Sequence, residues 1–331
     1  MFRCLFLFIL TLPLSAEHTL FACVMNAATY VVGAKLPPSG VFRKLPSGEW
    51  QHVGFNHPFT SALAYDAADP ATLYLAAGNG LIRLANRGEQ WKILTGSDVT
   101  ELRDVATDPH VSGSLYFAHT RGIANSVDSG KTWHDASGDL KRRYAETVRV
   151  DREYAGVLIA GTESGVFRSE DRGGHWRLSG AAGFQILRLE QSPFDSCFWL
   201  AATQQGGLFS SSDCGRSFEN TGGALALNRN LYEVAWDPHH LGRVAVAGFA
   251  FGIAISRDQG ITWTFHNRGL PRVDVWCLAF DPDHAGRIYA SVNEEAVYVS
   301  NDDGETWTPD GLPGKAARRL VFIPEAARSA R

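Results

Sequence analysis

An eight-residue pattern recurs along this chain and limits its fold more than any other feature. One copy runs from Ser126 to Trp133, with Ser first, Asp third, Gly fifth and Trp eighth. Four more copies place their acid at Asp171, Asp213, Asp258 and Asp302. Two weaker copies, ending at Trp50 and Trp91, keep the Gly and the Trp but lack the Asp. The chain therefore contains an internal repeat.

The spacing of the final aromatics predicts seven units. These residues stand 41 to 45 positions apart, at Trp50, Trp91, Trp133, Trp176, Phe218, Trp263 and Trp307. Within a unit, short apolar runs such as 234–238, 244–248 and 252–256 are bounded by Gly, Pro and Asp, which is typical of strands. A four-stranded unit of this length cannot bury both faces alone. We therefore expect an all-β fold, a seven-bladed β-propeller of four-stranded antiparallel blades.

The two ends of the chain are expected to close the ring. Residues 29–33 match the second strand of other units, and residues 319–324 match the first strand. Blade 1 is thus predicted to combine both termini, which leaves few exposed sheet edges. The predicted propeller spans residues 28–324, followed by a tail at 325–331.

The N-terminus reads as an export signal. Arg3 precedes an apolar run over 4–14 that is too short to anchor in a bilayer, and Ser15 and Ala16 follow. We expect a signal peptide over 1–16, then a linker over 17–27, in a secreted or periplasmic protein. A second cleavage position, after residue 22, resembles a lipobox; lipidated Cys23 would then give a membrane-associated lipoprotein.

The repeated motif resembles the Asp-box, or bacterial neuraminidase repeat, from about Thr29 to Ile323. An Asp carboxylate accepts backbone N–H groups across a tight turn, and Gly supplies a positive φ. One catalyst needs one site, whereas five identical acids suit five turns. We therefore assign a structural role to Asp128, Asp171, Asp213, Asp258 and Asp302. The acid-rich stretch 301–304 lacks the spacing of a calcium loop, and no metal or cofactor is expected.

Families with this repeat include sialidases, xyloglucan-cleaving hydrolases, sortilin-type receptors and photosystem II stability/assembly factors. A single propeller of seven short units looks most like the last group. The resemblance implies a non-enzymatic role, binding a protein partner in the cell envelope as an assembly factor or scaffold does.

The alternative is a glycoside hydrolase acting on extracellular glycans. A sialidase holds its substrate with three arginines, and Arg103, Arg188 and Arg318 would form such a triad only by accident of register. In the xyloglucanase resemblance, Glu163 stands at the place of one catalytic acid, but residues 34–36 offer no second acid.

The binding surface is predicted at the channel mouth opposite the Asp-box turns. Aromatic and arginine side chains are typical of recognition surfaces. A formal net charge of −4, without a basic stripe, makes nucleic acid an unexpected partner. Six residues are inferred to occupy equivalent positions in six blades: Arg103, Glu146, Arg188, Tyr232, Trp276 and Arg318.

Two cysteines are expected to pair after export. Cys197 opens the second strand of its unit, and Cys214 lies in the turn after the third strand. A hairpin centred near Gln205 places residue 197 opposite about residue 213. An oxidising compartment would then allow a disulfide between them.

Overall fold

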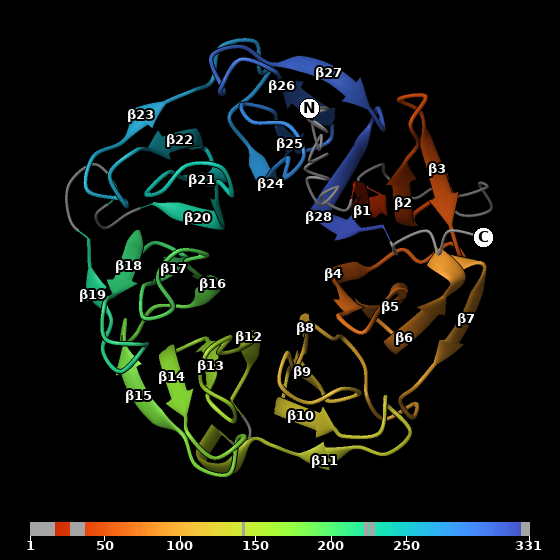
Figure 1. The fold of residues 1–331 in the computed structure, drawn as a ribbon, viewed down its shortest axis with the longest axis vertical. Coiled ribbons are helices and arrows are strands. Elements are labelled where there is room, and N and C mark those ends of the chain that lie inside the picture. The colour runs from red at the N-terminus through yellow and green to blue at the C-terminus, as the bar shows by residue number, and fades with distance from the viewer. Residues whose placement is uncertain (1–16, 27–36, 141–142, 222–224, 226–228, 326–331) are drawn as a thin grey trace, which may run out of the picture.

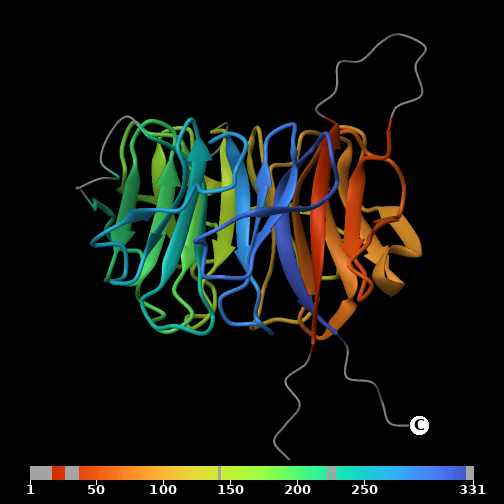
Figure 2. The ribbon, with the colours of Figure 1, turned by 90° about the horizontal axis from the view of Figure 1, so that it is seen from above.

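The structure is a computed structural model of the 331-residue chain that describes residues 17–26, 37–140, 143–221, 225 and 229–325. In these residues, seven four-stranded antiparallel sheets stand around a central axis (Figure 1). This confirms the seven-bladed β-propeller that the repeats predict. Seen from its edge, the ring is a thick disc whose strands run between its two faces (Figure 2).

Blade 1 joins the two ends of the described chain, and the other blades follow in chain order from the axis outward. From the axis outward, blade 1 contains β28 (Lys315–Pro324), β1 (His18–Asn26), β2 (Gly40–Lys44) and β3 (Trp50–Val53). Blades 2 to 4 contain β4 (Thr60–Asp66), β5 (Asp69–Ala77), β6 (Gly80–Ala85), β7 (Gln90–Ile93), β8 (Asp104–Thr107), β9 (Leu115–His119), β10 (Gly122–Ser126), β11 (His134–Asp135), β12 (Ala145–Val150), β13 (Leu158–Thr162), β14 (Gly165–Ser169) and β15 (Arg177–Gly180).

Blades 5 to 7 contain β16 (Ile186–Gln191), β17 (Trp199–Thr203), β18 (Leu208–Ser211), β19 (Glu219–Asn220), β20 (Asn230–Trp236), β21 (Val244–Phe249), β22 (Gly252–Ser256), β23 (Thr264–Phe265), β24 (Val275–Phe280), β25 (Ile288–Val292), β26 (Ala296–Ser300) and β27 (Thr308–Gly311). Two short 3-10 helices, η1 (Asn86–Gly88) and η2 (Gly138–Leu140), complete the described elements.

The hydrophobic core lies between neighbouring blades. Every residue of β13, β17 and β25 is buried, which explains the apolar character of these second strands. The box tryptophans also connect blades: Trp176 Nε1 donates to the Ala136 carbonyl at 3.0 Å, and Trp307 Nε1 donates to the His266 carbonyl at 2.8 Å. Each acceptor belongs to the preceding blade. At these two positions the aromatic that ends the motif therefore packs one blade against the next while satisfying its own N–H group.

Ring closure differs in one strand from the sequence prediction. The last strand, β28, is innermost in blade 1 as predicted, but its neighbour is β1, which it pairs along all of His18–Asn26. The segment predicted as a linker over 17–27 thus contains a strand, and the propeller begins at His18 rather than residue 28. The predicted second strand at 29–33 lies outside the described residues. The apolar sequence of β1 follows closely on the apolar run over 4–14, so the pattern alone did not separate this strand from the predicted signal.

This position of β1 bears on the predicted processing sites. Cys23 is fully buried between β28 and β2, and burial raises the pKa of its thiol to about 12. Cleavage before Cys23 would remove five of the nine residues of β1, whereas cleavage after residue 16 would leave the strand whole. Residues 1–16 and 326–331, which contain the predicted signal and most of the tail, lie outside the described residues.

The five strong motifs form turns at one face of the ring, which we call the box end. In the first, Ser126 Oγ donates to Asp128 Oδ1, and the same carboxylate accepts from the backbone N–H and the hydroxyl of Thr132. The residue after the acid, Ser129, has a φ of 59°. Corresponding hydrogen bonds form at the other four acids, Asp171, Asp213, Asp258 and Asp302.

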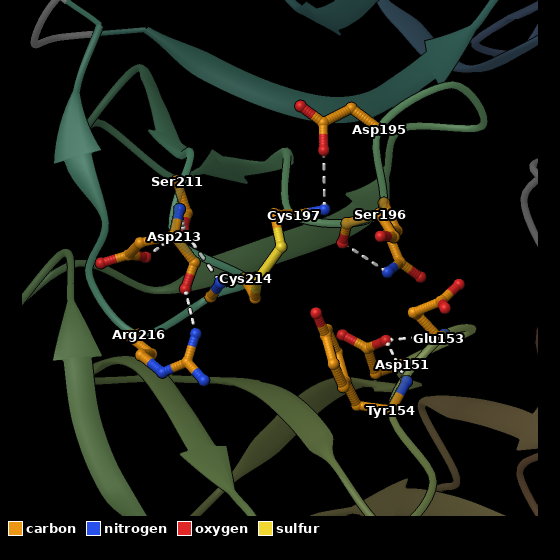
Figure 3. Close-up of a disulfide and its surroundings, with 12 residues drawn as sticks. Asp151, Glu153, Tyr154, Asp195, Ser196, Cys197, Ser211, Asp213, Cys214 and Arg216 are labelled. Atoms are coloured by element: carbon orange, nitrogen blue, oxygen red, sulfur yellow. Dashed lines mark hydrogen bonds between the residues drawn. A yellow bond between two sulfur atoms is a disulfide. The ribbon is translucent and has the colours of Figure 1, made fainter.

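Cys197 and Cys214 form a disulfide at the box end of blade 5 (Figure 3). The backbone N–H of Cys214 donates to the Cys197 carbonyl at 3.0 Å, and in blade 3 the same bond joins Ser129 to Gly113. A Cβ added to Gly113 would lie 2.8 Å from Ser129 Oγ, so side chains at these two positions are close neighbours. The disulfide thus occupies a backbone contact that the fold repeats.

Candidate functional site

Seven side chains surround the channel at the face opposite the box end. Six innermost strands contain a β-bulge near their start; in β12, for example, the register shifts between Ala145 and Thr147, leaving Glu146 as the extra residue. A bulge redirects its extra side chain. In blade 3, Arg103 stands directly before β8, and its N–H donates to the Ala118 carbonyl. These residues line a hollow of about 220 Å³, here called the bulge mouth: Ser61, Arg103, Glu146, Leu187, Tyr232, Trp276 and Arg318.

Five of the six predicted partner-binding residues belong to this ring, and Arg188 does not. The bulge of β16 lies between Ile186 and Arg188, so Leu187 takes the equivalent position. Arg188 lies one residue further along the strand and pairs with Glu190 and Glu233, deeper in the channel. A one-residue shift of register exchanges the faces of a strand, and no feature of the sequence marks where the bulge falls.

The acidic part of the bulge mouth is fully engaged. Arg103 donates two hydrogen bonds to Glu146, at 2.9 and 2.8 Å, and the Tyr144 hydroxyl donates to Glu146 Oε2 at 2.6 Å. Burial and the Glu146 carboxylate raise the pKa of Tyr144, which keeps its hydroxyl protonated as a donor. Glu146 is therefore a carboxylate with three donors on it, an arrangement that orients Arg103 and does not leave a free base.

The opposite side of the bulge mouth is aromatic. Arg318 lies over the ring of Trp276, with 3.9 Å between the guanidinium carbon and the ring centroid. The rings of Tyr232 and Phe249 pack against Trp276 at centroid distances of 4.7 and 5.9 Å. Trp276 Nε1 donates to Asn293 Oδ1 at 2.7 Å, which fixes its plane. Burial, and next the charge of Arg103, lower the pKa of Arg318.

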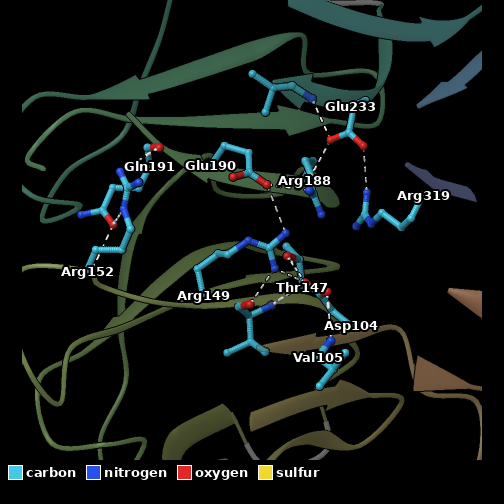
Figure 4. A network of polar contacts seen from close by, with 12 residues as sticks. Asp104, Val105, Thr147, Arg149, Arg152, Arg188, Glu190, Gln191, Glu233 and Arg319 are labelled. Atoms are coloured by element: carbon cyan, nitrogen blue, oxygen red, sulfur yellow. Dashed lines mark hydrogen bonds and ion pairs between the residues drawn. The ribbon is translucent and has the colours of Figure 1, made fainter. Parts of the chain in front are cut away.

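A chain of six alternating charges lies below the bulge mouth, and the sequence analysis did not predict it. It runs through five innermost strands, in the order Asp104, Arg149, Glu190, Arg188, Glu233 and Arg319 (Figure 4). The distances along it are 2.5, 3.2, 2.6, 2.7 and 3.2 Å. We call it the channel ion chain.

Two acids of the channel ion chain, Asp104 and Glu190, have lowered pKa values despite their burial. Burial opposes the charge of Asp104, but Arg149 and then Arg319 hold the pKa of its carboxyl below the usual value. The same balance, with Arg188 as the main partner, lowers the pKa of Glu190. In the sequence, the feature that could have indicated these buried charges is a charged residue within an apolar strand, as in Val148-Arg149-Val150. Buried charges persist when each has a partner, as these do.

Glu163, which the hydrolase alternative singles out, lies in the exposed loop between β13 and β14. Residues 34–36 are outside the described residues. In the described part of the chain, no three or more His, Cys, Asp or Glu side chains are grouped so as to hold a metal ion. Within the same residues, no helix is long and apolar enough to cross a membrane.

Comparisons with known proteins agree on the fold. No family model matches the sequence, and no curated protein matches it. Among solved structures, the GH74 xyloglucanase from Xanthomonas campestris is similar, with a TM-score of 0.62 and 20% identity, covering 76% of this chain and 45% of that one. YCF48 bound to a D1 peptide has a TM-score of 0.60 and 16% identity, covering 81% and 94%.

YCF48 from Cyanidioschyzon merolae is similar too, with a TM-score of 0.60 and 14% identity, covering 80% of this chain and 95% of that one. This chain therefore spans less than half of the xyloglucanase but nearly all of YCF48. Identities this low show a shared fold, and the two kinds of neighbour include both an enzyme and a peptide-binding protein.

Proposed function

We propose that this chain is an exported, non-enzymatic propeller that binds a protein partner at the bulge mouth. The observation that carries the proposal is the variety of side chains placed there by one repeated backbone feature. Six bulges and Arg103 present an arginine pair, a carboxylate, an aromatic cluster, a leucine and a serine around one hollow. Recognition of one partner requires such differences between blades, with aromatic and arginine anchors near the centre.

The peptide in the YCF48 structure supports the same class of function, because YCF48 is one propeller of nearly the same extent. The carboxylates near the bulge mouth support it as well. Glu146 and the acids of the channel ion chain are each held by arginine, whereas a glycosidase needs one free acid and one free base or nucleophile.

Capture from an envelope extract tests this proposal. A photo-crosslinking residue at Gln204, which is exposed and lines the bulge mouth, reports on proteins that contact this face. The test variant is Trp276→Ala with Arg318→Ala. The matched control, Phe265→Ala with Arg257→Ala, removes an exposed aromatic and an exposed arginine from blade 6, whereas Trp276 belongs to blade 7 and Arg318 to blade 1.

We expect one envelope protein to be cross-linked by the parent and the control, and much less by the test variant. Equal capture by all three proteins would overturn the proposal. Release of sugars from xyloglucan that Glu163→Gln abolishes would instead establish the glycoside hydrolase, the alternative that the GH74 similarity favours.

A further inference from the structure

A second hollow lies along the axis below the bulge mouth. It has a volume of about 360 Å³ and is here called the channel cavity. Its apolar wall includes Ala64, Ala106 and Val321, and its polar wall includes Arg149, Arg188 and Arg319 of the channel ion chain. A volume near the lower end of the range for ligand sites, with an apolar wall and a few converging polar groups, fits a small organic molecule.

Two residues on the wall of this cavity carry buried donors without acceptors in the described residues. Arg319 is 8% exposed, and its one ion pair within the described residues is with Glu233, through Nη1 at 3.2 Å. Its Nε has no hydrogen-bond partner in that part of the chain. The indole N–H of Trp199, also on the cavity wall and fully buried, is likewise unpartnered there. Unsatisfied buried donors are costly, so both point to a ligand that accepts hydrogen bonds.

The charge of the channel cavity favours an anion. Counting the side chains that line it together with Glu233, four arginines face three carboxylates, an excess of one positive charge. The arginines are Arg149, Arg152, Arg188 and Arg319, and the acids are Asp104, Glu190 and Glu233. A guanidinium binds a carboxylate more strongly than a neutral acceptor, because the hydrogen bonds are charge-assisted and the geometry matches.

We propose that the channel cavity binds a small organic carboxylate, with its carboxylate on Arg319 and its apolar body against Ala64 and Val321. This site is separate from the protein-binding role of the bulge mouth. The two meet at Arg319, which lines both hollows.

Calorimetric titration of the full chain with straight-chain carboxylates from acetate to octanoate tests the proposal. Affinity is expected to rise with chain length until the apolar wall is covered, and hexanamide is expected to bind at least about tenfold more weakly than hexanoate. Failure of every acid in the series to bind overturns the proposal, as does equal binding of the acid and the amide.

Two variants locate the site. Ala64→Leu fills the cavity without removing a charge and is expected to weaken hexanoate binding at least about tenfold, whereas Ala285→Leu, in an exposed loop, leaves it unchanged. Arg319→Gln is expected to weaken hexanoate but not hexanamide. If Arg319→Gln fails to fold, Ala64→Leu decides alone, because it leaves the channel ion chain intact. Unchanged hexanoate affinity in Ala64→Leu would place the acid elsewhere.

Discussion

The two faces of the ring use repetition in opposite ways. At the box end, five blades place the same Ser, Asp and Gly in the same hydrogen bonds, and the result is five equivalent turns. At the bulge mouth, the same backbone irregularity recurs, but the residue at it changes from blade to blade. One face therefore repeats its chemistry, and the other repeats only its geometry.

This difference separates stability from recognition. Identical turns hold identical blades, so a change there lowers the free energy of unfolding without favouring any ligand. Where the backbone is the same but the side chains differ, replacing one side chain should change the free energy of unfolding little. Those side chains determine which ligand binds.

Removal of residues 316–331 is expected to have the largest effect. It deletes nearly all of β28, which pairs with the whole of β1 and carries Arg318, so both closure and recognition are lost. The expected loss is comparable to the entire stability of a domain, about 5–15 kcal/mol. Thermal melting and solubility measure it, and removal of 326–331 alone is the control. A truncated protein that melts like the parent would contradict closure by β28.

The disulfide is expected to rank second. Replacing Cys197 and Cys214 with Ser should lower the free energy of unfolding by about 3 kcal/mol, the value expected for a closed loop of this length. Denaturant unfolding measures the change, and non-reducing peptide mapping checks the bond. Partner binding by the folded fraction should stay the same. If both thiols can be alkylated without reduction, the bond is absent.

The pair Trp276→Ala with Arg318→Ala should act in the opposite sense. Loss of the stacked guanidinium and its aromatic support is expected to weaken partner binding by at least about 2 kcal/mol. The melting midpoint should move little, because both side chains are only partly buried. Titration calorimetry with the captured partner measures the affinity. Normal binding by the double variant would remove the bulge mouth as the site.

The smallest effect is expected at a single box acid. Asp302→Ala leaves turn donors without their acceptor, at an expected cost of about 1 kcal/mol because the group is exposed to solvent. The hydroxyl and the backbone N–H of Thr306 lower the pKa of Asp302 from 3.8 to about 2. A carboxyl with a lowered pKa stabilises the fold above its ordinary pKa, and this contribution disappears as pH falls toward 2.

The difference in melting midpoint between the parent and Asp302→Ala should therefore be full above about pH 5 and shrink between pH 4 and pH 2. Glu219→Ala, which removes an exposed acid outside the box turns, tests whether the effect belongs to the box acid. A pH-independent difference would contradict the assigned role. Partner affinity should be unchanged throughout.

The repeats in the sequence predicted the number of blades and their strand order. They did not predict features that depend on the position of a single residue. Seven aromatics at regular spacing were sufficient for the number of blades, and strand order followed from one unit. Leu187 and Arg188 could not be ranked, because a bulge of one residue leaves no mark in composition. β1 was hidden because a strand buried on both faces and an export signal share an apolar sequence. The channel ion chain could be recognised only from the arrangement of the blades in the ring, since its six members come from five blades.

Hydrogen exchange of the chain with and without its captured partner tests the separation of the two faces most directly. The account predicts slower exchange on binding in the segments before and at the bulges, such as 101–103, 274–276 and 316–318. The box turns at 128–132, 258–262 and 302–306 should exchange at unchanged rates. Protection confined to the box turns, with the bulge segments unaffected, would contradict the account.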